Sequence, residues 1–365
     1  MTTFKTAENV HNGGSDPTDE TTLYAEDWNN LVNVVKHNEY FYAMRKMWRH
    51  ILGYAPWTSR TSANNYNWHG LCWSPELSLF VAVSLSGTGN RCMTSPDGVT
   101  WTARTTSNDY DWRSVCWSPA LSLFVAVGST GGTTRVMTST NGTSWTTRNS
   151  ASNNNWGSVC WSPDLAIFVA VSFSGTGTRV MTSTNGTSWT TRTSAADDDW
   201  RSVCWSPALG IFVAVASAGS GGRVMTSPDG INWTSRSASS SAQWQSVCWS
   251  EELGLFAACT LNNSGSGIMT SPDGVTWTNR TAGGTDDFYS IAWSPALGIF
   301  CAVATTGTGN RCMTSPDGVT WTRRSSAADN GWLEVCWSEE LGLFAAVSDT
   351  GTGNRVMTSK RVSTN

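Results

Sequence analysis

The tetrapeptide Trp-Thr-x-Arg recurs along the chain at a fixed interval of 44 residues, and this period constrains the fold more than any other feature. The copies begin at Trp57, Trp101, Trp145, Trp189, Trp233, Trp277 and Trp321. Such a period is typical of repeat proteins, whose units bury their apolar faces against their neighbours. The last repeat runs out at Ser359 without its own tetrapeptide, so the copy at Trp57 is spare. We therefore predict a closed ring in which the segment around Trp57 completes the last unit.

Each repeat contains four strand-like segments. In the second repeat, residues 112–117 carry large side chains on both faces, and 123–127 are continuously apolar, as in strands buried on both sides. Segments 135–139 and 143–148 follow, joined by an Asn-Gly turn typical of hairpins. The pattern predicts an all-β fold, a seven-bladed β-propeller of four-stranded blades over residues 54–359.

The residues before the repeats have a different pattern. Residues 1–22 are polar, and we expect an extended arm there. Residues 23–53 have apolar side chains at spacings of three and four, which predicts an amphipathic helix for attachment or oligomerisation. The stripe consists of Trp28, Leu31, Val35, Met44, Trp48 and Ile51. The alternative is that this helix covers its stripe by packing on the propeller. Residues 360–365 are expected to form a C-terminal tail.

Composition excludes several classes of function. No run of about 18 apolar residues is present, so we expect no membrane insertion, and the polar start lacks a signal-peptide core. A net charge of -4 gives no indication of a nucleic-acid partner. Six of the ten cysteines share one repeat position just before a Trp, which indicates free thiols in the core. Because no histidine joins a cysteine cluster at ligand spacing, we expect neither a metal nor a cofactor.

The hairpin Ser95-Pro-Asp-Gly-Val-Thr-Trp101 resembles the Asp-box of sialidase-like and lectin-type propellers, although it is one residue shorter. The resemblance implies a folding device on the rim. A sialidase would also need an arginine cluster, a Tyr/Glu pair and an acidic residue at unique places. The arginines at positions such as Arg91 and Arg104 are instead repeated around the ring, and Glu76 and Asp164 alternate with Ala. We therefore predict no catalytic residues and no enzymatic activity.

The stretch Leu23-Tyr-Ala-Glu-Asp-Trp-Asn-Asn-Leu-Val-Asn-Val-Val35 resembles the N-terminal attachment regions of bacteriophage tail fibres and other virion appendages. The resemblance implies a virion protein made in the host cytoplasm. It also implies contacts with other virion proteins through the N-terminal region, and a homo-oligomer such as a trimer.

A comparison of the repeats with one another indicates a binding face. The connections from strand four to the next strand one, and from strand two to three, vary between repeats and lie on one face of a propeller. Their amide and carboxylate groups, beside the Trp that opens most blades, suit sugar rings. The candidate ligand-binding residues are Asn65, Tyr66, Trp68, Asp109, Tyr110, Trp112, Asn155, Trp156, Asp199, Trp200, Gln243, Trp244, Asp287, Phe288, Asn330 and Trp332. The alternative is that solvated loops drift without a ligand.

Together these patterns favour a non-enzymatic virion appendage protein that recognises a host-surface glycan or polysaccharide through several weak, similar sites. The first alternative is a protein-protein interaction scaffold in a virion or an assembly complex. The second is a glycosidase of the sialidase-like kind.

Overall fold

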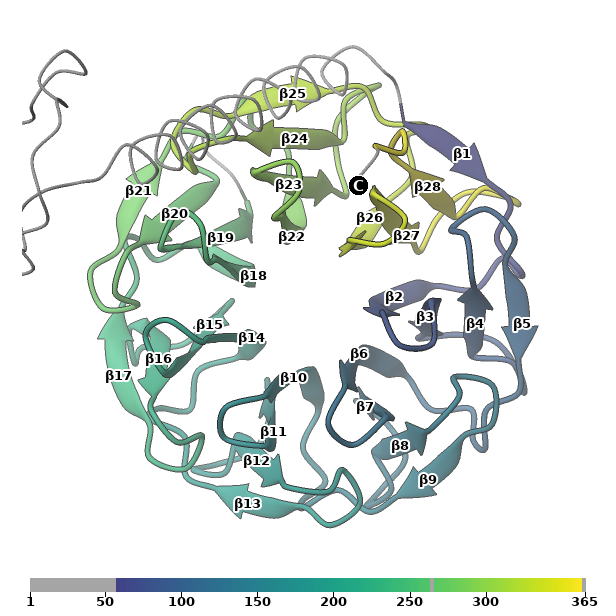
Figure 1. Ribbon diagram of the computed structural model, residues 1–365. Coiled ribbons are helices and arrows are strands. Elements are labelled where there is room, and N and C mark those ends of the chain that lie inside the picture. Colours follow the sequence, from purple (N-terminus) through teal and green to yellow (C-terminus); the bar gives the residue numbers. More distant parts are fainter. Residues whose placement is uncertain (1–56, 263–265, 363–365) are drawn as a thin grey trace, which may run out of the picture. The chain divides into compact units, whose positions relative to one another are not determined.

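The computed structural model describes residues 57–262 and 266–362, all of which belong to the compact unit Ile51–Asn365 (Figure 1). The predicted arm, residues 1–22, and the predicted helix, residues 23–53, lie outside the described residues, as do Trp28, Leu31, Val35, Met44, Trp48 and Ile51.

The described residues form a seven-bladed β-propeller, as the repeat predicts. Seven four-stranded antiparallel sheets surround one axis, and the first strand of every blade is innermost (Figure 1). The first strands are β2 (Trp68–Ser74), β6 (Trp112–Ser118), β10 (Trp156–Ser162), β14 (Trp200–Ser206), β18 (Gln243–Ser250), β22 (Phe288–Ser294) and β26 (Trp332–Ser338). The second strands are β3 (Leu79–Ser84), β7 (Leu123–Gly128), β11 (Ile167–Ser172), β15 (Ile211–Ala216), β19 (Leu255–Leu261), β23 (Ile299–Ala304) and β27 (Leu343–Ser348).

The two outer strands of each blade are shorter. The third strands are β4 (Cys92–Ser95), β8 (Val136–Ser139), β12 (Val180–Ser183), β16 (Arg223–Ser227), β20 (Ile268–Ser271), β24 (Cys312–Ser315) and β28 (Val356–Thr358). The outermost strands are β5 (Thr102–Arg104), β9 (Thr146–Arg148), β13 (Thr190–Arg192), β17 (Thr234–Ser237), β21 (Thr278–Arg280), β25 (Thr322–Arg324) and, for the seventh blade, β1 (Thr58–Arg60).

The ring closes through β1, which confirms the prediction made from the spare tetrapeptide. Strand β1 pairs antiparallel with β28, so that Ser59 lies opposite Met357. The Arg60 side chain donates from Nε to Thr358 Oγ1 at 2.9 Å, and Trp57 packs beside Phe344. The seventh blade therefore takes three strands from the C-terminal end of the described chain and one from its start.

The hydrophobic core lies between neighbouring blades, which explains why both faces of each sheet are apolar. In one junction, Trp68, Phe80 and Met93 of the first blade pack against Ala345 and Val347 of the seventh, and all five are fully buried. The other clusters repeat this arrangement around the ring. Burial of an aromatic or large aliphatic side chain stabilises a fold by about 1.5–3 kcal/mol, so the junctions supply most of the stabilisation.

The Asp-box-like hairpins are turns held by their own side chains. Asp97 Oδ1 accepts hydrogen bonds from the amides of Val99 and Thr100, each at 2.8 Å. Ser95 Oγ accepts from the amide of Gly98, whose φ of 72° is favourable for glycine. The Trp101 indole donates to the Gly98 carbonyl at 3.1 Å. These contacts give the motif a structural role at the join between the third and fourth strands.

The acidic residues that alternate with Ala in the turns after the first strands also have a structural role. Each accepts a hydrogen bond from the indole nitrogen of the next blade. The pairs are Trp73 with Glu340, Trp117 with Glu76, Trp205 with Asp164, and Trp293 with Glu252. These bonds join neighbouring blades at the turns that follow the first strands.

Candidate functional site

One position in the repeat has a different residue type in almost every blade, and only arginine occurs there twice. This position faces the axis. It is the residue that follows the buried Trp or Phe near the start of each first strand, where the strand register shifts and the residue bulges out of the ladder. In blade order the residues are His69, Arg113, Gly157, Arg201, Gln245, Tyr289 and Leu333. A bulge re-aims a side chain, and bulges are frequent beside functional sites. The flanking residues of the strand are nearly constant, so the sevenfold symmetry is broken where the blades converge.

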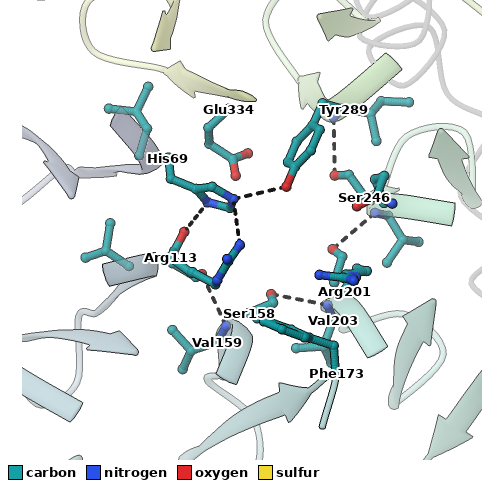
Figure 2. A pocket seen from close by; sticks show the side chains of 18 residues that line it. His69, Arg113, Ser158, Val159, Phe173, Arg201, Val203, Ser246, Tyr289 and Glu334 are labelled. Atoms are coloured by element: carbon teal, nitrogen blue, oxygen red, sulfur yellow. Dashed lines mark hydrogen bonds between the residues drawn. The ribbon is translucent and has the colours of Figure 1, made fainter. Parts of the chain in front are cut away.

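These residues surround a hollow at one end of the axis, which we call the axial hollow (Figure 2). The axial hollow has a volume of about 190 Å³. Six of the seven bulge residues line it, together with Phe173, Glu334 and the small residues that follow in each strand. Because first strands begin and second strands end there, the hollow opens on the face that carries the variable loops.

Two arginines are the principal charged groups of the hollow. The Arg113 guanidinium lies 4.9 Å from the centre of the Phe173 ring, and that of Arg201 lies 4.2 Å from it. Arg113 Nε donates to Ser129 Oγ at 2.9 Å, and Arg201 Nε donates to Ser217 Oγ at 2.8 Å. Both arginines are thus fixed in the same way, by a serine of their own blade and by one shared aromatic ring.

His69 is neutral and its tautomer follows from its partners. Burial, reinforced by the charge of Arg113, lowers the pKa of His69 to about 3. Its Nδ1 lies 2.7 Å from the Arg113 carbonyl, which only accepts, so Nδ1 carries the proton. Nε2 therefore accepts, from the Tyr289 hydroxyl at 3.1 Å and from Arg113 Nη1 at 3.4 Å. Burial also raises the pKa of Tyr289, which keeps the phenol protonated.

Glu334 replaces the serine found at its position in five other blades. Those serines form a ladder, because each Oγ accepts the amide hydrogen bond of the next blade. The ladder is interrupted at Glu334 and at Gly70, the two positions on either side of the join between blades seven and one. Glu334 accepts a hydrogen bond from Ser290 Oγ. Burial raises the pKa of Glu334 to about 7, so this carboxyl is only partly ionised at neutral pH.

None of the residues predicted to bind a ligand lines the axial hollow. The prediction that the aromatic rings at the starts of the blades bind a sugar is wrong. Trp68, Trp112, Trp156, Trp200, Trp244, Phe288 and Trp332 are fully buried between blades, so they present no face to a sugar. The reason is that the Trp or Phe near the start of each first strand points into the junction, whereas the bulge residue after it lies towards the axis.

The two tyrosines of these loops are held by packing. Tyr66 lies against Trp68 and beneath Gly87, where a Cβ would come within 2.3 Å of the tyrosine ring. Tyr110 has the same relationship with Gly131. Each glycine has a positive φ, of 109° and 110° respectively. Both rings are half-buried, and each hydroxyl bonds the neighbouring loop.

The polar loop residues mostly join neighbouring blades. Arg91 donates to Asp111, and Arg135 donates to Asn155 Oδ1 at 2.7 Å. The same kind of contact occupies Asn65 with Gly353, Asp109 with Gly89, Asp199 with Arg179, and Asp287 with Asn262. Asn330 donates to the Asn354 carbonyl within blade seven, and Gln243 is exposed. These bonds give the loops a structural role, and recognition of a ligand by them stays a prediction.

Sequence reasoning missed the axial constellation because it compared the loops of the repeats and not the individual positions of the strands. The signal was present: within seven nearly identical first strands, the residue after the first Trp or Phe changes among His, Arg, Gly, Gln, Tyr and Leu. The repeat also hid Arg113 and Arg201, since thirteen other arginines occupy two regular positions. These two belong to neither position, and their place at the axis is unique.

Within residues 57–262 and 266–362, no group of three or more His, Cys, Asp or Glu residues is arranged to hold a metal ion. The ten cysteines are all unpaired. The same part of the chain contains no helix with the length and apolar character to cross a membrane.

No protein-family model and no curated protein matches the sequence. Solved structures do match the fold. A streptogramin B lyase superposes with a TM-score of 0.68 at 7% identity, covering 84% of this chain and 96% of that one. Virginiamycin B lyase from Staphylococcus aureus gives 0.67 at 6% identity, covering 81% and 95%. YCF48 from Cyanidioschyzon merolae gives 0.60 at 15% identity, covering 84% and 99%. At such identities the likeness shows the propeller fold alone.

Proposed function

We propose that the protein is a non-enzymatic binding protein of the virion appendage class, which recognises a host-surface glycan at the axial hollow. The observation that carries the proposal is the broken symmetry at the axis. Blades that are otherwise near copies place six different residue types on the same bulge, and five of these types meet in one hollow. A polar, concave and asymmetric surface of this kind is what a specific small-ligand site requires. Attachment to the virion through residues 1–56 is part of the proposal.

Binding is favoured over hydrolysis by the composition of the hollow. Glycoside hydrolysis usually uses two carboxylates about 5–10 Å apart. Among the described lining residues, Glu334 is the single carboxyl group. Each propeller has one axial hollow, so avidity would come from several copies of the protein on one virion. This proposal replaces the expectation of several weak sites on one propeller.

The experiment is a binding screen of the full chain against a glycan array and host-surface polysaccharide. Gln245→Trp should abolish binding, because the larger side chain fills much of the hollow. Leu121→Ser is the matched control, since Leu121 lies in the turn between β6 and β7, at the other end of the axis, and is 38% exposed. If the folded wild-type chain binds neither glycans nor host cells, the proposal is wrong and the scaffold alternative gains support.

A second candidate, sialidase-like hydrolysis, is favoured by one observation: Tyr289 and Glu334 share the hollow with two arginines. Sialidases use a tyrosine as nucleophile. Against it, the Tyr289 hydroxyl donates to His69 and burial raises its pKa, so it is not activated for attack. Turnover of a chromogenic sialoside by the wild type, lost in Tyr289→Phe, would establish this activity in place of binding alone.

A further inference from the structure

We infer that the axial hollow is a site for one compact oxyanion, a carboxylate, phosphate or sulfate group carried by a sugar, held between Arg113 and Arg201. The inference names the ligand class of the proposed glycan site, and for the sugar it rests on that proposal. The anion site itself follows from the two arginines, the groups that surround them and the size of the hollow.

The first argument is that the axial arginines are not neutralised. On the rim, Arg91 lies 2.9 Å from Asp111 and Arg179 lies 2.9 Å from Asp199. Arg113 forms no ion pair within the part of the chain that the structure describes, and Arg201 has only a distant one, 4.0 Å from Asp199. Two guanidinium groups in a partly enclosed hollow produce a concentrated positive potential that attracts an anion.

The second argument is that both guanidinium groups are oriented in advance. Each uses its Nε on a serine hydroxyl and its planar face on Phe173, and these contacts hold it in place. Among the described residues, no hydrogen bond occupies Nη2 of Arg113 or either Nη of Arg201. A fixed guanidinium edge with unused donors matches the geometry of a carboxylate or phosphate, which accepts two parallel hydrogen bonds.

The third argument concerns the other titratable groups that face the hollow. His69 is neutral and Tyr289 is protonated, so neither cancels the positive charge. Glu334 is partly protonated near neutral pH, and its hydrogen bond comes from Ser290 and not from an arginine. The remaining lining residues are uncharged. Two guanidinium charges face one partly ionised carboxyl group, so the hollow keeps a net positive charge.

The volume limits the ligand. About 190 Å³ is below the roughly 300–1,000 Å³ of a pocket that encloses a drug-sized ligand. The hollow accommodates a charged group with part of one sugar ring. The rest of a glycan would leave through the open end and pass over the loops. A terminal or branching acidic sugar fits this description better than an internal neutral one.

The test is calorimetric titration of the full chain with glucuronate, glucose 6-phosphate, inorganic phosphate and glucose. Glucuronate or glucose 6-phosphate should bind at least about tenfold more tightly than glucose, and the double variant Arg113→Gln with Arg201→Gln should remove that difference. Gln is the residue of blade five at this position, so the variant suits the fold, and thermal unfolding checks it. Arg361→Gln removes an exposed positive charge at the Asp97 hairpin and should bind as the wild type.

The outcomes separate this inference from the proposed function. Equal binding of glucuronate and glucose, or an unchanged affinity in the double arginine variant, overturns the anion site. If host glycan still binds and Gln245→Trp abolishes it, the proposed function survives that failure. If inorganic phosphate binds through the arginines while no sugar adds affinity, the anion site stands and the glycan proposal fails. Comparison of glucuronate with glucose 6-phosphate identifies which acidic group the site prefers.

Discussion

The guanidinium of Arg201 lies 4.2 Å from the centre of the Phe173 ring, which comes from the neighbouring blade. Blade three has Gly157 at the bulge position, and a Cβ there would already touch the Phe173 ring at 3.4 Å. Phe173 therefore fills the place of the missing side chain and supports an arginine on each side. Blades two and four have serine where blade three has Phe173, and those serines hold the arginines. Three consecutive blades thus form one complementary arrangement.

Replacing Phe173 by Leu should weaken binding of an acidic sugar by about three- to tenfold. The physical reason is that the variant removes a cation-π contact worth about 0.5–2 kcal/mol from each of two guanidinium groups, which then lose their fixed orientation. Calorimetric titration with glucuronate measures the effect. Phe173→Tyr keeps the ring and is the matched control, expected to bind within about twofold of the wild type. Wild-type affinity in Phe173→Leu would show that the ring does not orient the arginines.

Binding of an anion at the hollow should weaken as pH rises through about 7, the pKa to which burial raises Glu334. Above that pH the carboxylate is ionised and repels the ligand, whereas Glu334→Gln stays neutral and should show a flat profile from pH 6 to 8. Titrations with glucuronate at several pH values measure this dependence. A profile equally steep in the wild type and in Glu334→Gln would assign the titration to another group.

Glu334 should also affect stability, with a sign that follows from its raised pKa. In the unfolded chain a Glu titrates near 4.3, so the folded state binds the proton more tightly, and this contribution is lost as pH rises from about 4.3 through 7. Glu334→Gln should therefore exceed the wild type in stability at pH 8 by on the order of 2 kcal/mol, with a smaller difference at pH 4. Chemical denaturation at both pH values measures the difference. Equal stability of the two proteins at pH 8 would contradict the raised pKa.

The fold was predictable because its determinants are local and repeated. The spacing of Trp-Thr-x-Arg, the apolar runs and the Asn-Gly or Asp-Gly turns specify four strands per blade, and the spare copy at Trp57 specifies closure. The axial site was not predictable in the same way. A bulge is not visible in a sequence, and the residues that meet at Phe173 are separated by 60 and 28 positions from Arg113 and Arg201, respectively. Only ring closure brings His69 beside Tyr289, which is 220 positions away.

The variable loops were predicted to form the binding face because they differ between blades. In the structure, Asp109, Asn155 and Asp199 instead form hydrogen bonds between blades. A polar side chain can satisfy such a bond in several ways, so the loops vary while their structural role is kept. Variation at the bulge has a different basis, because six of the seven bulge residues line a shared hollow and their side chains are not required for pairing.

Acid should destabilise the propeller through its Asp-box-like hairpins. Burial alone would raise the pKa of Asp229, but hydrogen bonds from the Asn232 and Ile231 amides outweigh it and lower this pKa to about 2. The pKa values of Asp97, Asp273 and Asp317 are also lowered. Because the folded pKa is depressed, the stabilisation is present above the unfolded value of about 3.9 and is lost as pH falls towards 2.

Changing all four aspartates to Asn should therefore make the stability of the fold fall less steeply between pH 4 and pH 2. The variant should also be somewhat less stable than the wild type at pH 7. The variant suits the fold, since Asn141 makes the same turn, accepting the Thr143 and Ser144 amides at 2.9 Å. Tryptophan fluorescence during acid titration measures this loss. The control is Asp164→Asn, which lies outside the hairpins and keeps a side-chain oxygen that can accept from the Trp205 indole. Identical acid curves for wild type and quadruple variant would exclude the hairpins as the acid-sensitive element.

Trp161 has a buried indole nitrogen without a hydrogen-bond partner among the described residues, and the repeat explains why. Trp117 donates to Glu76 of the preceding blade at 2.6 Å. At the matching position before Trp161 the chain has Ala120, which offers no acceptor. Where blade four also has Ala, at Ala208, Trp249 bonds Glu251 of its own blade instead at 2.7 Å. Blade three has Pro163 at that place, so Trp161 has neither partner.

Ala120→Glu should therefore stabilise the protein by about 0.5–1.5 kcal/mol, the net contribution of one hydrogen bond. The new carboxylate would occupy the geometry that Glu76 already has one blade earlier, and Ala120 is exposed, so the substitution causes no clash with the core. Thermal and chemical denaturation at pH 7 measure the gain. Ala208→Glu is the matched control, since Trp249 already has its acceptor, and it should change stability by less than about 0.5 kcal/mol. Equal gains in both variants would mean that added surface charge, and not the unsatisfied indole of Trp161, determines the effect.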